Sequence, residues 1–139
     1  MTHLLDTDIS SFVMKRSHPA LIERVRGFAA GDLKVSAVTA FELEFGARRS
    51  GRYPDLMRVI TAFLENVEVI PFDLSAAQHA GEIRLDLAAA GQPIGAYDLL
   101  IAGHARSRGF TLVTHNVSEF SRVERLEIED WANLPSGTG

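Results

Sequence analysis

Short runs of apolar residues alternate along the chain with longer segments in which apolar positions recur every three or four residues. The short runs are typical of buried strands, and the longer segments are typical of amphipathic helices. Strands are predicted at residues 3–5, 33–36, 67–72, 110–114 and 126–128, and helices at 9–14, 20–30, 38–49, 75–90, 96–107 and in the segment after residue 54. Strands separated by helices predict an α/β sandwich around a mostly parallel sheet of four to five short strands.

Several predicted helix ends carry residues that favour such positions. Pro19 and Pro54 stand where helices begin, and Ser75 is the expected N-cap of its helix. Glycines follow the predicted helices at positions 31, 51, 91 and 109. The local signals therefore agree with the apolar pattern.

The chain of 139 residues fits a single domain, predicted at 1–133 with a flexible tail at 134–139. The absence of cysteine excludes disulfides and thiolate metal sites and suits a reducing cytoplasm, the expected location. The sequence shows neither the pattern of a signal peptide nor an apolar run long enough to span a membrane. We therefore expect no membrane association.

Acidic residues stand where the predicted strands and helices meet. Asp6 follows the first strand, Glu42 lies on the helix after the second, Asp98 lies in the first turn of its helix, and Glu119 follows the fourth strand. Ligand sites of parallel α/β folds lie beyond the carboxyl ends of the strands. We therefore expect these acids to gather at one edge of the sheet.

Each acid also has a simpler interpretation. Asp6 is a suitable helix cap, Asp98 a suitable acid for a helix start, and Glu42 one charge on a solvated helical face. Glu44 points to nearly the opposite side of the same helix, so Glu42 and Glu44 cannot both serve one site.

A cluster of carboxylates needs a compensating cation. Two carboxylates about 4 Å apart repel by roughly 4 kcal/mol at an effective dielectric constant of 20. Oxygen ligands suit Mg²⁺ or Mn²⁺, and paired hard cations support phosphodiester cleavage. The acids therefore indicate a metal-dependent nuclease.

Four segments carry a family resemblance: Leu4-Leu5-Asp6-Thr7-Asp8-Ile9, residues 36–47 around Glu42, residues 93–105 around Asp98, and residues 112–120, which contain Thr114, Asn116 and Glu119. In order and spacing they resemble the four motifs of VapC-type PIN-domain toxins over nearly the whole chain. Taken together, the four segments are specific, although one alone would be weak evidence.

The resemblance implies a PIN-like three-layer sandwich. It also implies a Mg²⁺- or Mn²⁺-dependent endoribonuclease, the toxin of a type II toxin–antitoxin system. Its expected partners are a VapB-type antitoxin, an RNA substrate, for which tRNA is the first expectation, and a second copy of the chain in a homodimer.

The resemblance assigns the catalytic and metal-binding roles to Asp6, Glu42 and Asp98, and the fourth acidic position to Glu119, with Asn116 as its neighbour. Asp8 stands where many members have Asn, and we assign it a supporting role. The polar groups of Thr7, Thr114 and Asn116 are expected to orient carboxylates or water. Local turn and cap hydrogen bonds are the alternative for these groups.

The formal net charge of −4 is unusual for a protein that binds RNA. Two groups of arginines offer an answer, since they follow the helices that carry Glu42 and Asp98: Arg48, Arg49 and Arg52, and Arg106 and Arg108. We expect them to hold the RNA backbone beside the acidic site. Favourable interaction with helix dipoles is the alternative explanation.

Two other functions remain open at this point. The Asp6-Thr7-Asp8 segment resembles the nucleophile motif of haloacid-dehalogenase-like phosphotransferases, in which Asp6 would attack phosphorus, although a convincing later lysine motif is missing. A non-catalytic binding module on the same fold is the second alternative.

Large apolar residues are numerous in the helices after residues 38 and 54. Val38, Phe41 and Phe45 share one helical face, and Phe45, Leu56 and Phe63 are expected to exceed what a monomer core can hide. This surplus favours the homodimer.

Overall fold

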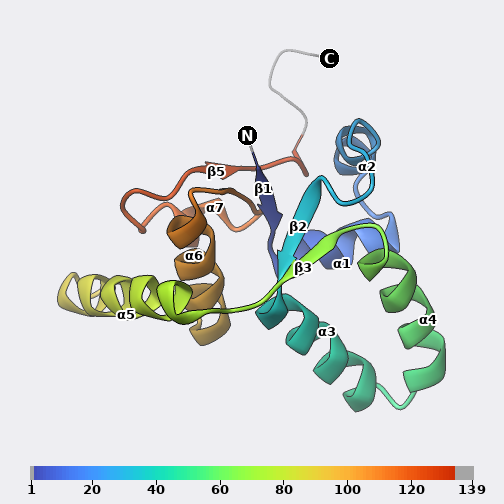
Figure 1. The fold of residues 1–139 in the computed structure, drawn as a ribbon, viewed down its shortest axis with the longest axis horizontal. Coiled ribbons are helices and arrows are strands. Elements are labelled where there is room, and N and C mark those ends of the chain that lie inside the picture. Colours follow the sequence, from blue (N-terminus) through green and yellow to red (C-terminus); the bar gives the residue numbers. More distant parts are fainter. Residues whose placement is uncertain (1, 134–139) are drawn as a thin grey trace.

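Five short strands form a wholly parallel sheet at the centre of the molecule (Figure 1). The computed structural model describes residues 2–133, so the predicted tail 134–139 lies outside the described residues. The strands are β1 (His3–Leu5), β2 (Leu33–Ser36), β3 (Glu68–Ile70), β4 (Thr111–Val113) and β5 (Ile128–Glu129), and their order in the sheet is β3-β2-β1-β4-β5. The predicted α/β fold class is confirmed.

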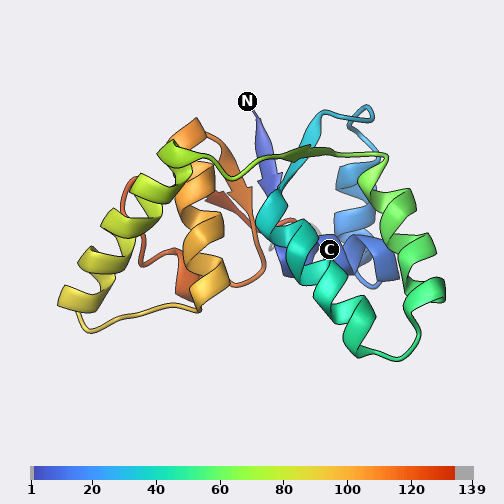
Figure 2. The same cartoon turned by 60° about the horizontal axis from the view of Figure 1, so that its bottom comes forward.

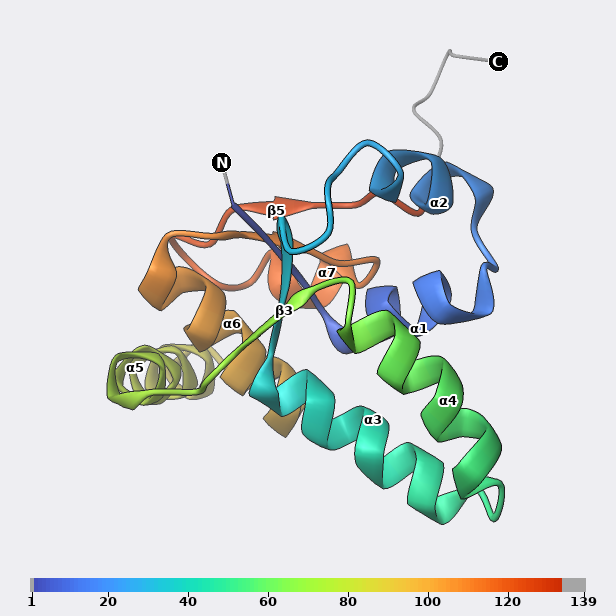
Figure 3. The same ribbon diagram turned by 45° about the vertical axis from the view of Figure 1, so that its right-hand side comes forward.

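Helices cover both faces of this sheet and complete the three layers. They are α1 (Thr7–Lys15), α2 (Pro19–Val25), α3 (Ala37–Arg49), α4 (Tyr53–Leu64), α5 (Leu74–Ala89), α6 (Ala96–Arg108) and α7 (Val117–Phe120). Figure 2 shows α5 and α6 on one side of the sheet and α3 and α4 on the other. In Figure 3, α3 and α4 lie side by side and are joined at one end by a short turn. Within residues 2–133, every helix is too short or too polar to cross a membrane.

The strands are apolar on both sides because each side faces a helical layer. Successive residues of a strand point to opposite faces. Leu4 and Leu112 accordingly belong to the core beneath α5 and α6, whereas Leu5 and Val113 belong to the core beneath α1 to α4. This burial explains why the strands appear in the sequence as short continuous apolar runs.

Several predicted boundaries were wrong, such as that of the fifth strand, which was expected at 126–128 and is Ile128–Glu129; three of them differ for local reasons. The helix expected at 20–30 ends at Val25, and residues 26–28 continue as turns. Asp73 rather than Ser75 caps α5, since its Oδ1 accepts the N–H of Ala76 at 3.0 Å. The strand expected at 67–72 ends at Ile70, where the next residue, Pro71, has no N–H for the ladder.

The chain reverses its direction across the sheet between β3 and β4. After β3, at one edge, it passes through α5 and α6 and returns as β4 on the other side of β1. The crevice at such a switch point lies beyond the carboxyl ends of the two central strands, here β1 and β4. Asp6 follows β1 and donates its N–H to the carbonyl of Val113 in β4 at 3.0 Å, so Asp6 stands at this crevice.

Helices α5 and α6 approach closely at Gly103. A Cβ atom there would lie 2.6 Å from the backbone nitrogen of Ala80 and 2.7 Å from its Cα. We expect Gly103→Ala to lower the free energy of unfolding by about 1 to 3 kcal/mol, because overpacking outweighs the better helix propensity of alanine. Urea denaturation measures the change.

The matched control is Gly81→Ala in α5, where an added Cβ meets nothing within 4 Å. That variant should gain roughly 0.5 to 1 kcal/mol from helix propensity alone. Equal effects of the two substitutions would contradict the close approach of α5 and α6.

Candidate active site

Asp6 is the buried member of the acidic set, with 2% of its surface exposed. Its Oδ1 accepts the N–H of Ile9 at 2.8 Å and thereby caps α1, and the Thr114 side chain also hydrogen-bonds to it. Burial raises its pKa to about 6; the hydrogen bonds from Thr114 and Ile9 oppose this rise, and the charges of Asp8 and Glu42 add to it. Asp6 is therefore both a cap and a carboxylate that is costly to ionise.

Glu42 lies in the second turn of α3 and is half-buried. The hydroxyl of Thr7 donates to its Oε1 at 2.7 Å and contacts the hydroxyl of Thr39 at 3.0 Å. Glu44 pairs instead with Arg48, whose Nε donates to Glu44 Oε2 at 3.0 Å. The two neighbouring acids thus face different surroundings, and Glu42 is the one beside Asp6.

Asp98, in the first turn of α6, lies against Glu119 of α7. The pKa of Asp98 is raised to about 7. Burial is the largest cause, and it is followed by the charge of Glu119, a hydrogen bond between the two side chains, and the charges of Asp6 and Glu42. Ionisation of Asp98 is therefore opposed both by burial and by the neighbouring carboxylates.

Glu119 is also held by two other hydrogen bonds. The N–H of Gly95 donates to Glu119 Oε1 at 2.6 Å, and Asn116 Nδ2 donates to Glu119 Oε2. A Cβ on Gly95 would lie 3.3 Å from Asp98 Oδ2 and 3.7 Å from Glu119 Oε1, so the missing side chain leaves room for both carboxylates.

The structure thus brings together all four acids that were predicted from sequence. They come from four separate elements, and the charges that raise the pKa of Asp98 belong to the other three. Within residues 2–133, no three His, Asp or Glu side chains are already arranged to ligate one ion directly. The donor set is nevertheless all oxygen and mutually repulsive, which fits a hydrated hard cation held through one or two carboxylates and water.

The residues expected in supporting roles surround this set. Thr7 contacts Glu42, Thr114 contacts Asp6, and Asn116 contacts Glu119. The Thr114 hydroxyl also accepts the N–H of Asn116 at 3.0 Å. Asp8 is exposed at the edge of a groove of about 530 Å³ that runs among α1, α3 and α4.

The arginines fall into different environments from those expected. Arg106 is buried; it donates to Glu82 at 2.6 Å, to His79 at 3.0 Å and to the carbonyl of Glu124 at 3.1 Å. The prediction that Arg106 contacts RNA is therefore wrong, because its guanidinium joins α5 and α6 to the segment before β5. Arg108 lies ten residues beyond Asp98, about 15 Å along the helix, so it does not border the acids.

The three arginines of the first group, Arg48, Arg49 and Arg52, have different surroundings. Arg48 lies over the ring of Tyr53 and pairs with Glu44. Arg52 is exposed at the turn before α4, beyond the end of α3, whose last residue already lies about 10 Å along the helix from Glu42. Arg49 lies over the ring of Phe45 and lines a hollow together with Glu42.

Sequence reasoning missed this hollow of about 330 Å³, which we call the aromatic hollow. It is lined by Thr7, Phe41, Glu42, Phe45, Gly46, Arg49 and Tyr97. The available signal was that an aromatic residue directly precedes two of the acids, in Phe41-Glu42 and Tyr97-Asp98. These rings therefore belong to the surroundings of the active site.

The fold and the acidic site are those of a PIN-domain nuclease, and the PIN domain family profile matches residues 4–126. A tRNA(fMet)-specific endonuclease VapC from Shigella flexneri is 42% identical to this chain over 129 residues, covering 93% of this chain and 97% of that protein. A crystal structure of DNA-bound VapBC from Salmonella typhimurium contains a chain with a TM-score of 0.88 and 38% identity, covering 94% of this chain and 98% of that one. The VapBC2 structure from Rickettsia felis, bound to a promoter DNA fragment, gives a TM-score of 0.87 at 29% identity, covering 94% and 99% of the two chains.

The chain therefore belongs to the PIN-domain family and, within it, to the VapC ribonucleases of toxin–antitoxin systems. Its class of activity is that of an endoribonuclease.

Proposed function

We propose that this endoribonuclease depends on Mg²⁺ or Mn²⁺ held by Asp6, Glu42, Asp98 and Glu119. The observation that carries the proposal is the convergence of these four acids from separate elements, with ionisation of Asp6 and Asp98 opposed by burial and by the other carboxylates. A cation relieves this repulsion. When bound, such ions stabilise the attacking water and the leaving oxygen of a phosphodiester.

The chain's own residues orient the carboxylates. Thr7 holds Glu42 at 2.7 Å, and the backbone of Gly95 holds Glu119 at 2.6 Å. Thr114 and the N–H of Ile9 hold Asp6 from the strand and helix sides. In the proposed site, such hydrogen bonds fix the positions of the carboxylates as ligands of the ions.

The two alternatives drawn from sequence lose their support. The PIN-domain match over residues 4–126 argues against the phosphotransferase hypothesis, in which Asp6 would be a nucleophile. The hypothesis of a non-catalytic binding module loses support because all four acids are present and clustered. A metal titration separates it from the proposal, since a module without catalysis should bind Mn²⁺ without RNA cleavage.

We propose tRNA as the substrate class, because the Shigella flexneri relative is a tRNA(fMet)-specific endonuclease. We expect incubation of the purified protein with total tRNA and Mg²⁺ to produce discrete fragments. Sequencing of the fragment 5′ ends identifies the tRNA and the cleaved bond, and a reaction in excess chelator is the control. Uncut tRNA alongside cleaved messenger RNA would contradict this substrate. An RNA substrate also implies action in the cytoplasm.

We further propose that a VapB-type antitoxin binds the groove among α1, α3 and α4, whose apolar lining includes Leu43, Leu56 and Val59. Related structures from Salmonella, Rickettsia and Haemophilus are VapBC complexes. Val59 is 46% exposed, and we expect Val59→Glu to weaken binding of the antitoxin by about tenfold or more while cleavage is kept. Titration calorimetry of the co-purified partner measures the change.

Leu85→Glu is the control for this experiment, because Leu85 is 70% exposed on α5, across the sheet from the groove. Equal loss of affinity in both variants would place the antitoxin elsewhere.

The homodimer stays a prediction. Phe63 is buried and Leu56 is half-buried, so these two do not exceed the monomer core, whereas Phe45 is 54% exposed. Sedimentation velocity at micromolar concentration is the measurement, and a purely monomeric protein would contradict the prediction.

A further inference from the structure

Two aromatic–acid pairs stand at the rim of the active site. In Phe41-Glu42 and Tyr97-Asp98 the acid faces the carboxylate cluster, whereas the rings remain 50% and 46% exposed. Neighbouring residues of a helix point about 100° apart, so turning the acid inward leaves the preceding ring at the edge. The two rings come from α3 and α6, and their centroids lie 5.3 Å apart.

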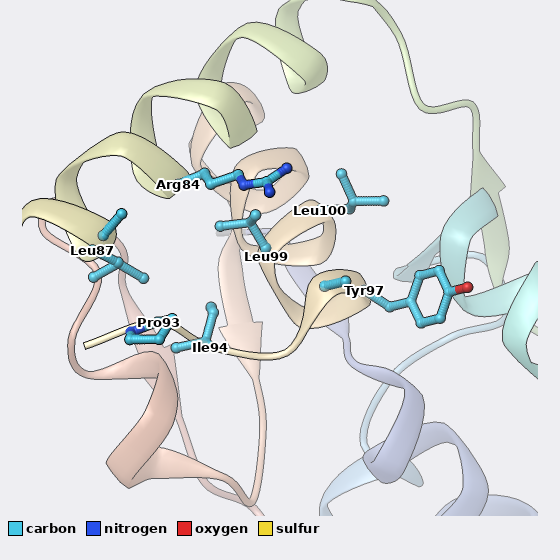
Figure 4. A pocket seen from close by; sticks show the side chains of 9 residues that line it. Arg84, Leu87, Pro93, Ile94, Tyr97, Leu99 and Leu100 are labelled. Carbon is cyan, nitrogen blue, oxygen red and sulfur yellow. The ribbon is translucent and has the colours of Figure 1, made fainter. Parts of the chain in front are cut away.

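The rings form one wall of the aromatic hollow, and Glu42 and Thr7 form another. Figure 4 shows Tyr97 in the first turn of α6, with its ring turned away from Pro93 and Ile94 and toward α3. The guanidinium of Arg49 lies 5.4 Å from the centre of the Phe45 ring, at the same hollow. The hollow therefore combines aromatic faces, one positive charge and a direct border with the acidic site.

The charge of the protein makes such a surface useful for RNA. The formal net charge is −4, and Arg106 is engaged inside the fold. Phosphate attraction to arginines is therefore a weak source of affinity next to four acids. Stacking of bases on aromatic side chains is insensitive to net charge and strengthens binding by roughly fivefold to a hundredfold per base.

We propose that Phe41 and Tyr97 bind an unpaired nucleobase next to the cleaved phosphodiester, with Arg49 contacting an adjoining phosphate. The inference rests on the proposed function, because it assigns a base-binding subsite to the same RNA-cleaving centre. Proteins that act on RNA recognise unpaired, unstacked bases in this way, by stacking on aromatic rings.

The size and position of the hollow favour a base over a protein partner. Its volume of about 330 Å³ is at the lower end of the range for small-ligand sites, roughly 300 to 1,000 Å³. The larger apolar groove, which we proposed for the antitoxin, adjoins the hollow and shares four lining residues with it, but neither Phe41 nor Tyr97 lines that groove. An RNA phosphate placed at Glu42 has its flanking nucleotide within reach of the hollow, since Glu42 belongs to the acidic site and also lines the hollow.

The test measures coupling between ring and base. The probe is a single-stranded RNA of about ten nucleotides with a fluorescent 2-aminopurine at its centre. The control probe has the same sequence with an abasic nucleotide at that position. In Mg²⁺-free buffer, in which the proposed nuclease leaves the probe intact, wild-type protein should quench the 2-aminopurine and bind it about tenfold more tightly than the abasic probe. Phe41→Ala and Tyr97→Ala should abolish both the quenching and the preference for the base.

Three further variants separate stacking from a general change in the fold. Tyr97→Phe retains the ring and should retain the quenching. Gly46→Leu should fill the hollow, because an added Cβ at Gly46 meets nothing within 4 Å, and should remove the preference for the base. Leu85→Ala, at an exposed position of α5, should leave binding unchanged.

Independent, additive effects of removing the ring and removing the base would overturn the inference. A shift of Phe41→Ala from dimer to monomer with base preference intact would overturn it too, and would assign this face to a second copy. Cleavage of RNA by the wild-type protein is measured in parallel. Cleavage without ring–base coupling refutes the base site alone, whereas coupling without cleavage refutes the nuclease alone.

Discussion

Asp98→Asn should lower the rate of RNA cleavage by about a hundredfold to a thousandfold, the range observed when one preorganised charge-stabilising group is removed. Asn keeps the size of the side chain and removes the charge that lies against Glu119 and is coupled to Asp6 and Glu42. The cation then loses a ligand, while the start of α6 keeps its shape. Single-turnover cleavage at saturating protein measures the effect.

The same substitution should stabilise the protein in the absence of metal. The pKa of Asp98 is about 7 instead of 3.8, so ionisation of this residue at pH 8 opposes folding. Each pKa unit corresponds to about 1.4 kcal/mol, but Asp98 is partly exposed and solvent screens the repulsion, so we expect a gain of about 1 to 2 kcal/mol. A rise of roughly 4 °C in Tm for each kcal/mol is expected for a domain of this size.

Asp86→Asn is the matched control, because Asp86 is exposed on α5, away from the acidic site. It should change neither cleavage nor Tm. Full activity of Asp98→Asn would refute the assignment of Asp98, and lower stability without metal would refute the proposed repulsion within the cluster.

Removal of divalent cations should abolish cleavage, and the stability of the metal-free protein should fall as the pH rises. The pKa values of Asp6 and Asp98 in the folded protein, about 6 and about 7, lie above their ordinary value of 3.8. The folded state therefore binds more protons than the unfolded state between these values. The stabilising contribution of protonation is complete below about pH 4 and is lost as the pH rises through 6 to 7.

Cation binding should reverse this loss, because a positive ion offsets the repulsion that opposes ionisation of Asp6 and Asp98. The difference in Tm between Mg²⁺-saturated and chelator-treated protein should be small at pH 5 and increase toward pH 8, since ligand binding to the folded state alone stabilises it. Differential scanning calorimetry across this range measures it. Asp98→Asn should flatten the pH dependence. Cleavage in excess chelator, or a Tm that is independent of Mg²⁺ at pH 8, would contradict a metal-dependent site.

The local pattern of the chain predicted the sheet, and together with the family resemblance it predicted the four acids of the site. A strand such as His3–Leu5 is apolar throughout because it is covered on both faces, and the residue that follows it must stand at the edge of the sheet. Asp6, Glu42, Asp98 and Glu119 each lie directly after a strand or near a helix start, so their meeting at one edge follows from the parallel topology. That information is contained in the order of residues over a few positions.

Packing between distant segments decided the rest. Helical periodicity places Val38, Phe41 and Phe45 on one apolar face, but the core reaches Val38 and leaves both rings exposed. The position of Arg106 in the last turn of a helix predicts an exposed side chain. It is buried instead, because Glu82, 24 residues earlier in the chain, contacts it inside the fold. The raised pKa of Asp98 likewise depends on the contact between α6 and Glu119 of α7. Such environments depend on which elements pack together, so they are absent from the pattern of any one segment and arise only in the tertiary structure.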